Sequence, residues 1–195
     1  MLTIKSVCVF CGSADRLNPE YIHSAREMGG LLAAERITMI FGGGKTGLMG
    51  AVAEGCLTAG GKVIGVITPE LDIPALAFSD GFEKDVMPDL ETRKTRMRDL
   101  ADEFIILPGG FGTFDEFFST LTLAQLGLIS KPIGLLNTRS YFDPLMAMLQ
   151  HALVEKFIYP EHLELIQIEH EPVDLLNALR SYRPPADLPR WIERE

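Results

Sequence analysis

The chain has 195 residues, of which 47% are hydrophobic, and its 27 acidic and 18 basic residues give a net charge of −9. This length suits one domain with a full core, and the acidic balance disfavours general binding to nucleic acid or membranes, because both present polyanionic surfaces. No apolar run approaches the roughly 20 residues needed to cross a bilayer, and no signal peptide precedes the first apolar run, so we expect a cytoplasmic protein.

Short apolar runs alternate with amphipathic stretches along the chain. The runs predict strands over residues 6–10, 37–41, 62–67, 84–87, 104–107, 133–136 and 165–168. The stretches between them predict helices over 19–34, 48–59, 89–101, 113–126, 142–155 and 173–179. Such alternation is typical of a parallel sheet wrapped by helices, and strands buried on both faces are continuously apolar. We therefore predict one α/β domain over 1–195, Rossmann-like and doubly wound, with a surface tail from about 183 to 195.

Three cysteines are an odd number for a secreted scaffold and indicate a reducing compartment. Cys8 and Cys11 have the C-x-x-C spacing, but Cys8 lies inside an apolar run, whereas a redox pair usually opens a helix. Only Cys56 and four scattered histidines remain to complete a zinc site. We favour structural cysteines over redox or metal-binding ones, and we assign the histidines no role.

Three turns rich in small residues follow predicted strands, at 11–14, 42–50 and 108–113. In an open parallel sheet, ligands bind beyond the carboxyl ends of the strands. A plain turn remains an alternative for the first of them, because such loops favour glycine and serine anyway. Three consecutive glycines carry an entropic cost that a ligand would explain. We expect a binding site at this edge, with Ser13, Gly43 and Gly44 among its substrate contacts.

The second turn also resembles two nucleotide motifs. Gly42-x-Gly44-x-x-Gly47 matches the dinucleotide fingerprint. That fingerprint usually follows the first strand of a sheet, and an acidic residue then stands at the end of the next strand. Here Thr68 and a proline stand at that point. A Walker A loop would need a glycine at Met39. Both matches are weak, so a dinucleotide-dependent oxidoreductase is a distant alternative.

Residues 104–116 are the most informative stretch. An apolar run stops at Pro108, passes through three glycines and continues as a helix that carries Asp115 and Glu116. The start of a helix offers unpaired N–H groups and a positive dipole end, which suit a phosphate. Glu116 is expected about one turn into this helix, where it would repel a plain anion. We interpret it as a reactive acid beside a phosphate site.

Four basic residues within six lie just before this stretch: Arg93, Lys94, Arg96 and Arg98. Arg93 and Met97 share a helix face, as do Lys94 and Arg98. A solvated helix face is the alternative explanation. This helix lies just before the strand at 104, so it could place a cation near the turn at 108–113, which we call the anion loop. Arginine suits such a position, because its guanidinium binds phosphate or carboxylate through two hydrogen bonds.

Together these residues resemble the LOG family, the cytokinin riboside 5′-monophosphate phosphoribohydrolases, whose relatives have often been labelled lysine decarboxylases. The resemblance rests on Arg93-Lys94, the segment 108–113 with Glu116, and the glycines of 42–50, and it extends from Cys8 to about Ile158. It implies cleavage of the N-glycosidic bond of a nucleoside 5′-monophosphate, which releases free base and ribose 5-phosphate. No residue argues for decarboxylation.

The resemblance also implies roles by position. Arg93 and Glu116 match the catalytic pair. Substrate contacts match Lys94, Gly110, Phe111, Gly112, Thr113, Phe114, Asp115 and Thr122. The family uses no metal or organic cofactor and forms homodimers or assemblies of dimers, with the site near the subunit interface.

Alternatives remain open for the substrate. A general nucleosidase acting on AMP would share these motifs, and Pro88 and Thr92 are less typical of the family, which leaves the base unspecified. A nucleotide or cofactor carrier could use the phosphate site without turnover, although simple anion binding gains nothing from Glu116. Several apolar side chains could line a pocket for an N6 substituent, or belong to the core or a dimer interface: Met87, Met97, Phe114, Phe117 and Phe118.

Overall fold

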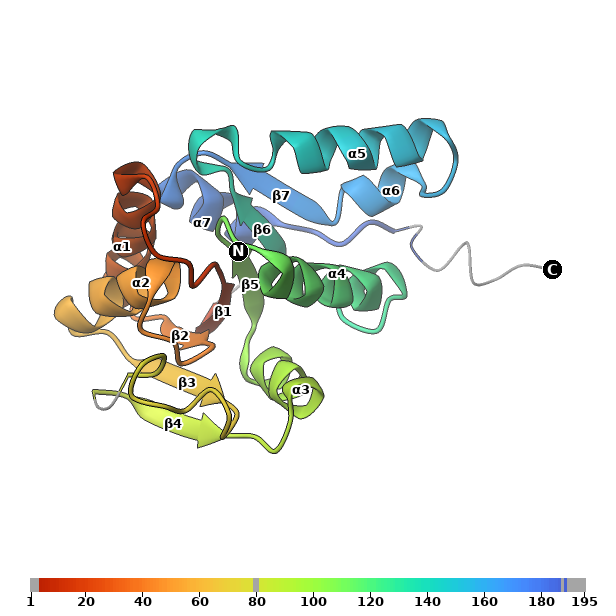
Figure 1. Ribbon diagram of the computed structural model, residues 1–195. Coiled ribbons are helices and arrows are strands. Elements are labelled where there is room, and N and C mark those ends of the chain that lie inside the picture. Colours follow the sequence, from red (N-terminus) through yellow and green to blue (C-terminus); the bar gives the residue numbers. More distant parts are fainter. Residues whose placement is uncertain (1–3, 79–80, 187, 189–195) are drawn as a thin grey trace.

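The computed structural model describes residues 4–78, 81–186 and 188 and contains one seven-stranded sheet between two layers of helices (Figure 1). Every pair of neighbouring strands is parallel, in the order β4-β3-β2-β1-β5-β6-β7. The strands are β1 (Ser6–Phe10), β2 (Thr38–Phe41), β3 (Val63–Ile67), β4 (Glu83–Val86), β5 (Glu103–Ile106), β6 (Ile133–Leu136) and β7 (Ile166–Glu169). The predicted doubly wound, Rossmann-like parallel sheet is confirmed.

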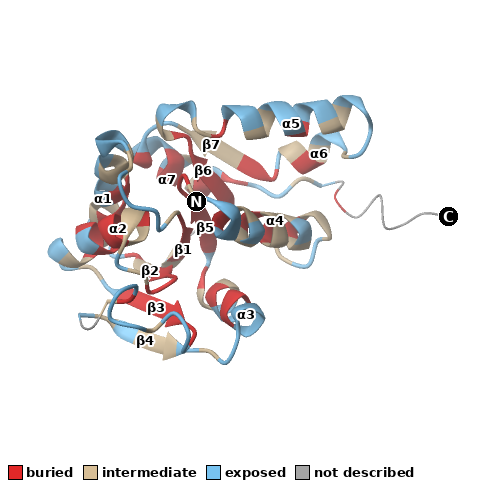
Figure 2. Ribbon diagram, viewed as in Figure 1, coloured by how far each residue is buried: buried red, intermediate tan, exposed pale blue. Residues whose placement is uncertain are grey.

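Each central strand contributes to two cores, because successive side chains point to opposite faces of a sheet. Val7 and Val9 of β1 join one buried cluster, while Cys8 and Phe10 join the other. The first face is covered by α1 (Pro19–Ala34), α2 (Gly47–Thr58) and α7 (Pro172–Ser181), and the second by α3 (Leu90–Leu100), α4 (Phe111–Gln125) and α5 (Asp143–Val154). Strands β3, β5 and β6 are buried at every residue (Figure 2), which explains why their sequences are apolar except for Glu103 at the start of β5.

The element boundaries agree with the predictions to within two residues. Two short helices were not predicted, η1 (Thr138–Ser140) and α6 (Pro160–Leu163). The difference that bears on function is in α4, which begins at Phe111 because Gly110 is its N-cap. Glu116 therefore lies five residues after the first residue of the helix, more than one turn of 3.6 residues, which corrects its expected position.

The edge strand β4 departs from the apolar pattern. Its side chains are partly or fully exposed, because it has a neighbour on one side only. The connection that leads to it from β3 contains no helix among its described residues, 68–78 and 81–82, as the sequence predicts. An antiparallel bridge between Gly44 and Ala77 fixes this connection beside the turn after β2.

Three further features concern expectations from the sequence. Cys8, Cys11 and Cys56 are free and buried, and burial raises the pKa of Cys56 to about 11, which fits a structural role. Leu188 in the predicted tail is buried in the second core, while residues 187 and 189–195 lie outside the described part. Among the described residues, no helix is long and apolar enough to cross a membrane, and no group of three or more His, Cys, Asp or Glu side chains could hold a metal.

The order of the strands determines where a ligand can bind. From β1 the chain proceeds through β2 and β3 to β4 at one edge, and then returns to the other side of β1 with β5. The crevice beyond the carboxyl ends of β1 and β5 is thus the topological switch point, where open parallel sheets bind their ligands.

Candidate active site

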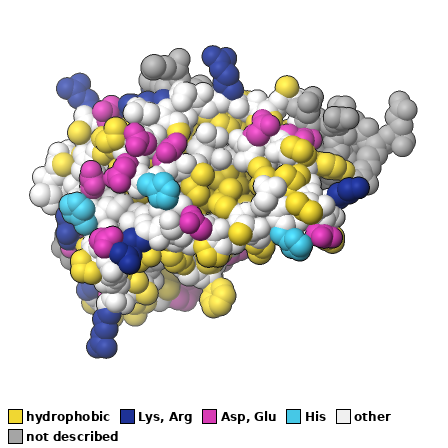
Figure 3. Space-filling model, turned by 90° about the horizontal axis from the view of Figure 1, so that it is seen from above, with side chains coloured by type: hydrophobic (Ala, Val, Ile, Leu, Met, Phe, Trp, Pro, Cys, Tyr) yellow, Lys and Arg dark blue, Asp and Glu magenta, His cyan; other side chains and the backbone are white. Residues whose placement is uncertain are grey.

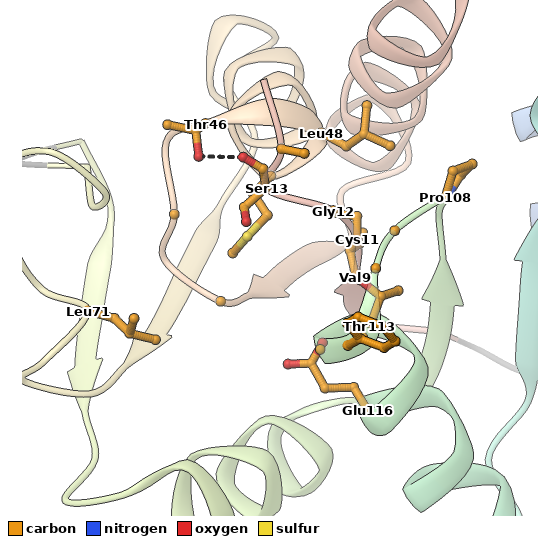
Figure 4. A pocket seen from close by; sticks show the side chains of 18 of the residues that line it. Val9, Cys11, Gly12, Ser13, Thr46, Leu48, Leu71, Pro108, Thr113 and Glu116 are labelled. Atoms are coloured by element: carbon orange, nitrogen blue, oxygen red, sulfur yellow. Dashed lines mark hydrogen bonds between the residues drawn. The ribbon is translucent and has the colours of Figure 1, made fainter. Parts of the chain in front are cut away.

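A cavity of about 620 Å³ occupies this switch point (Figure 4). The turns after β1, β2 and β5 all line it, so the three predicted turns do meet at one edge of the sheet. Hydrogen bonds link these turns directly. The amide of Gly12 donates to the carbonyl of Pro108 at 3.0 Å, and the Thr46 hydroxyl donates to the carbonyl of Ser13 at 2.8 Å.

The two helices that begin at glycine turns differ in what their first N–H groups do. In α2, the amides of Leu48 and Met49 both donate to the carbonyl of Gly12, at 2.9 and 3.3 Å. In α4, no side chain caps the start, and the amides of residues 111–113 have no partner among the described residues. A helix start with free amides suits an anion. The start of α4 is therefore the better candidate for an anion site, because two of the first N–H groups of α2 already have a partner.

The glycines of the α4 turn have separate functions. A Cβ at Gly109 would overlap the hydroxyl of Thr113 and come within 2.8 Å of the amide of Gly12, so packing requires this glycine. A Cβ at Gly110 or Gly112 would meet nothing within 4 Å. These two positions leave the start of α4 open to a ligand.

Glu116 and Arg93 form the charged centre of the cavity. The carboxylate of Glu116 points from α4 into the cavity, as Figure 4 shows. Its Oε1 accepts a hydrogen bond from Nη1 of Arg93 at 3.0 Å, and Nε of Arg93 donates to the carbonyl of Val66 at 2.8 Å. A Cβ at Gly42 would overlap the Arg93 guanidinium. Two hydrogen bonds and a glycine thus fix the arginine against the carboxylate.

The environment of Glu116 changes its acidity. Burial raises the pKa of the Glu116 carboxyl above its ordinary value, and the Arg93 guanidinium opposes this by favouring the ionised form. Oε2 of Glu116 has no hydrogen-bond partner in the described part of the chain. One carboxylate oxygen is held and the other is available, which suits a general base or a stabiliser of positive charge.

The remaining basic residues of α3 are already paired. Lys94 is buried, and its Nζ contacts Glu91 at 2.6 Å and Asp115 at 2.9 Å. The hydrogen bond to Glu91 is the main cause that raises the pKa of Lys94. Arg96 lies on the exposed side and pairs with Asp85 at 2.6 Å. The basic cluster therefore combines both explanations, because Arg93 lines the cavity while Arg96 belongs to a solvated face.

Eight of the predicted site residues line the cavity: Ser13, Gly44, Arg93, Gly110, Phe111, Gly112, Thr113 and Glu116. Five do not: Gly43, Lys94, Phe114, Asp115 and Thr122. Gly43 packs against Ile67 with a positive φ of 76°, and Phe114 packs against the second core. Thr122 is exposed on α4, and its hydroxyl donates to the carbonyl of Phe118. The roles of all these residues stay predictions.

The cavity has further lining residues that no motif indicated. Tyr21 and Tyr141 form one part of the lining, and apolar side chains form another, the apolar wall: Leu71, Leu76 and Leu90. Residues 71 and 76 belong to the connection that the sequence places near a site. Of the apolar side chains considered for the pocket, Met97 lines it, whereas Phe117 is buried in the core and Met87 and Phe118 pack against that core.

Known proteins resemble this chain in sequence and in fold. The family model described as "Possible lysine decarboxylase" matches residues 49–179. The cytokinin riboside 5′-monophosphate phosphoribohydrolase of Rhodococcoides fascians is 40% identical over 180 residues, which cover 92% of this chain and 91% of that protein. A phosphoribohydrolase of the same name from Arabidopsis thaliana is 37% identical over 183 residues, 94% of this chain and 84% of that one.

Solved structures extend the likeness of fold. The molybdenum cofactor binding protein of Rippkaea orientalis matches with a TM-score of 0.69 and 22% identity, over 93% of this chain and 98% of that one. At this identity the likeness concerns the fold alone.

Proposed function

The chain belongs to the LOG family, named for cytokinin riboside 5′-monophosphate phosphoribohydrolases, and from this membership we propose that it hydrolyses the N-glycosidic bond of a nucleoside 5′-monophosphate. The products would be a free base and ribose 5-phosphate. One observation carries the proposal. The open start of α4 and the carboxylate of Glu116, paired with Arg93, lie in the same cavity.

The start of α4 would bind the 5′-phosphate. The free amides of residues 111–113 and the positive end of the helix dipole favour an anion there. The hydroxyl of Thr113, also in the first turn, would add a donor. Lys94 has two carboxylate partners, so it would act on the phosphate through the local field rather than by direct contact.

Glu116 would act on the sugar. It lies five residues along α4, and at about 1.5 Å per residue its position is about 7.5 Å along the helix axis from the helix start. A phosphate at the helix start would thus place the ribose over the carboxylate. Cleavage at C1′ passes through an oxocarbenium-like state, which Oε2 would stabilise, and the same oxygen would take a proton from the attacking water. Arg93 would hold the carboxylate in place and in its ionised form.

The base would lie against the apolar wall. Leu71, Leu76 and Leu90 are partly exposed although they line the cavity, so an apolar ligand could cover them. This wall supports an N6-modified adenine, as in a cytokinin nucleotide, over unmodified AMP.

Decarboxylation does not fit this cavity. A decarboxylase that uses pyridoxal phosphate needs a lysine amine for the Schiff base. No lysine lines the cavity in the described part of the chain. Lys45, in the turn after β2, donates to the carbonyl of Pro74, and Lys94 is paired with two carboxylates.

We also propose that the protein is a homodimer or an assembly of dimers, as the family resemblance implies. In α5 only Leu149 is buried, although most of the helix is apolar. Met148, Val154 and Phe157 are more than half exposed, and hydrophobic side chains gather on this face of the molecule (Figure 3). Light scattering after gel filtration would measure the assembly, and a monomer at all concentrations would reject it.

The activity is tested by measuring ribose 5-phosphate release from AMP and from N6-isopentenyl-AMP, with Glu116→Gln as the matched control. Release that depends on Glu116 supports a phosphoribohydrolase, and a higher kcat/KM for the isopentenyl substrate supports the cytokinin assignment. Nucleotide binding without release from either substrate would replace the proposal with a carrier. Tight binding of NAD(H) would favour the oxidoreductase alternative.

A further inference from the structure

Tyr141 joins the site from outside the motifs. It lies in the turn that connects β6 to α5, it lines the cavity, and its hydroxyl donates to the carbonyl of Gly109 at 2.5 Å. No other side chain bonds to a backbone group of the 108–112 turn in the described part of the chain. A residue 32 positions away in sequence thus holds the anion loop.

This hydrogen bond fixes one peptide unit. The carbonyl of Gly109 and the amide of Gly110 belong to the same planar trans peptide, so they point in opposite directions. Because both flanking residues are glycines, side chains do little to prevent that peptide from rotating. Rotation would turn a carbonyl toward the place where the amide now points. The Tyr141 hydroxyl opposes it by holding the carbonyl.

The turn that carries Tyr141 is itself held in an unusual conformation. Arg139 and Ser140 have φ values of 55° and 57°, in the left-handed region that costs energy for residues other than glycine. The side chain of Asn137, 2% exposed, accepts the amide of Phe142 at 2.8 Å and so closes the turn. The strained turn places the Tyr141 hydroxyl beside the carbonyl of Gly109.

We propose that Tyr141 is a positioning residue for the phosphate: it sets the orientation of the Gly109–Gly110 peptide and thereby keeps the amide of Gly110 available at the start of α4. The proposal rests on the proposed function, since it assumes that the ligand carries a phosphate. Tyr141 contacts the loop rather than the reacting bond.

Aromatic packing is the competing explanation. The ring of Tyr141 packs edge-on against Tyr21 and Phe142, with centroid distances of 6.1 and 5.1 Å. Tyr141→Phe keeps this ring and removes only the hydroxyl, which separates the two explanations. Tyr182→Phe is the matched control, because Tyr182 is buried but does not line the cavity.

Ribose 5-phosphate is the probe, and calorimetry would measure its dissociation constant for the wild type and both variants. We expect Tyr141→Phe to weaken binding about tenfold, the usual scale for a hydrogen bond to a charged group. The KM of the nucleotide should rise by a similar factor while kcat changes little, because this contact holds the phosphate before and during the reaction. Tyr182→Phe should leave both constants unchanged.

Equal binding by Tyr141→Phe and the wild type would overturn the inference, as would a fall in kcat with KM unchanged. A lower unfolding midpoint with normal binding would assign the hydroxyl a structural role only. If the wild type binds ribose 5-phosphate but cleaves no nucleotide, the proposed function is rejected. The difference in ribose 5-phosphate binding between the wild type and Tyr141→Phe would then still test the role of Tyr141. A wild type that binds no sugar phosphate would reject both.

Discussion

Two glutamates with little exposed surface lie toward opposite ends of β5, and only one of them faces a cavity. Glu103 is the first residue of the strand, and Glu116 lies in the helix that follows it. Burial raises the pKa of both carboxyls. Glu116 has Arg93 at 3.0 Å, whereas neither carboxylate oxygen of Glu103 has a hydrogen-bond partner among the described residues. A cation therefore forms a hydrogen bond with Glu116 but not with Glu103.

This difference separates Glu116, the proposed reactive acid, from Glu103, an acid of the core. Glu103 is fully buried, and its pKa is raised to about 8, because the opposing charge of Arg180 does not outweigh burial. Arg180 itself pairs with Glu35 at 2.6 Å. A carboxyl of this kind is protonated at neutral pH and reaches no substrate. A perturbed pKa therefore identifies a candidate active site only together with a cavity and a partner.

The largest expected effect comes from neutralising Glu116, the proposed reactive acid. Glu116→Gln should lower kcat/KM for the nucleotide by about 10² to 10⁴, the usual contribution of a general base. Glu103→Gln should leave turnover at the wild-type level, since this residue does not line the cavity. Ribose 5-phosphate release measures both. Full turnover by a folded Glu116→Gln protein would remove the distinction between the two glutamates.

A smaller loss should follow from moving the cation while both acids remain. In Gly42→Ala, the added Cβ overlaps the Arg93 guanidinium and displaces it from Glu116. Misplacement of a catalytic group by about 1 Å can cost about 10²-fold, so we expect a loss of about 10- to 100-fold in kcat/KM.

Gly30→Ala in α1 is the matched control, because its Cβ meets only the carbonyl of Gly55, at 3.9 Å. It should retain full activity and stabilise the helix by roughly 0.5 to 1 kcal/mol. If Gly42→Ala were as active as Gly30→Ala, the activity of the protein would not depend on the contact between Arg93 and Glu116.

The pH dependence of the reaction should reflect the same contact. Glu116 acts in its ionised form and burial raises its pKa, so kcat/KM should fall as the pH falls through a value above the ordinary 4.5. In Gly42→Ala the guanidinium opposes burial less, and this acid limb should move to higher pH. The substrate phosphate titrates equally with both proteins, so the shift between them reports the carboxylate. A limb that stays in place would show that Arg93 does not support ionisation.

The sequence predicted the sheet well, because strands buried on both faces are continuously apolar. It placed the start of β5 at Phe104, one residue late, since an acidic residue is unusual in a central strand. Pairing of Val7 with Glu103 in the parallel register nevertheless places Glu103 inside the sheet. The pattern of residue types therefore could not predict that the carboxyl of Glu103 is buried without a hydrogen-bond partner.

The candidate site could be predicted where a characteristic residue type stands at a characteristic place, such as directly after a strand. Glycines at the end of a strand indicated the anion loop, whereas the family resemblance paired Arg93 with Glu116 across 23 positions. Tyr141 had no signal, because its contact with Gly109 depends on the order of β5 and β6 in the sheet and on the strained turn after β6.

Glu103→Gln should change stability and leave turnover unaltered. In the wild type, the folded protein retains the Glu103 proton up to a pH of about 8, whereas the unfolded chain loses it near the ordinary value of 4.5. Stability from this group is thus fully present below 4.5 and is lost as the pH rises to about 8, by up to about 1.4 kcal/mol per pH unit. Glutamine cannot titrate, so this slope should be absent in the variant.

Urea unfolding of both proteins between pH 5 and 9 measures this slope, and all other titrating groups cancel in the difference. The free energy of unfolding of the variant relative to the wild type should rise up to a pH of about 8 and then level off. Parallel curves would mean that Glu103 is ionised in the folded protein, and the contrast with Glu116 would then rest on the cavity alone.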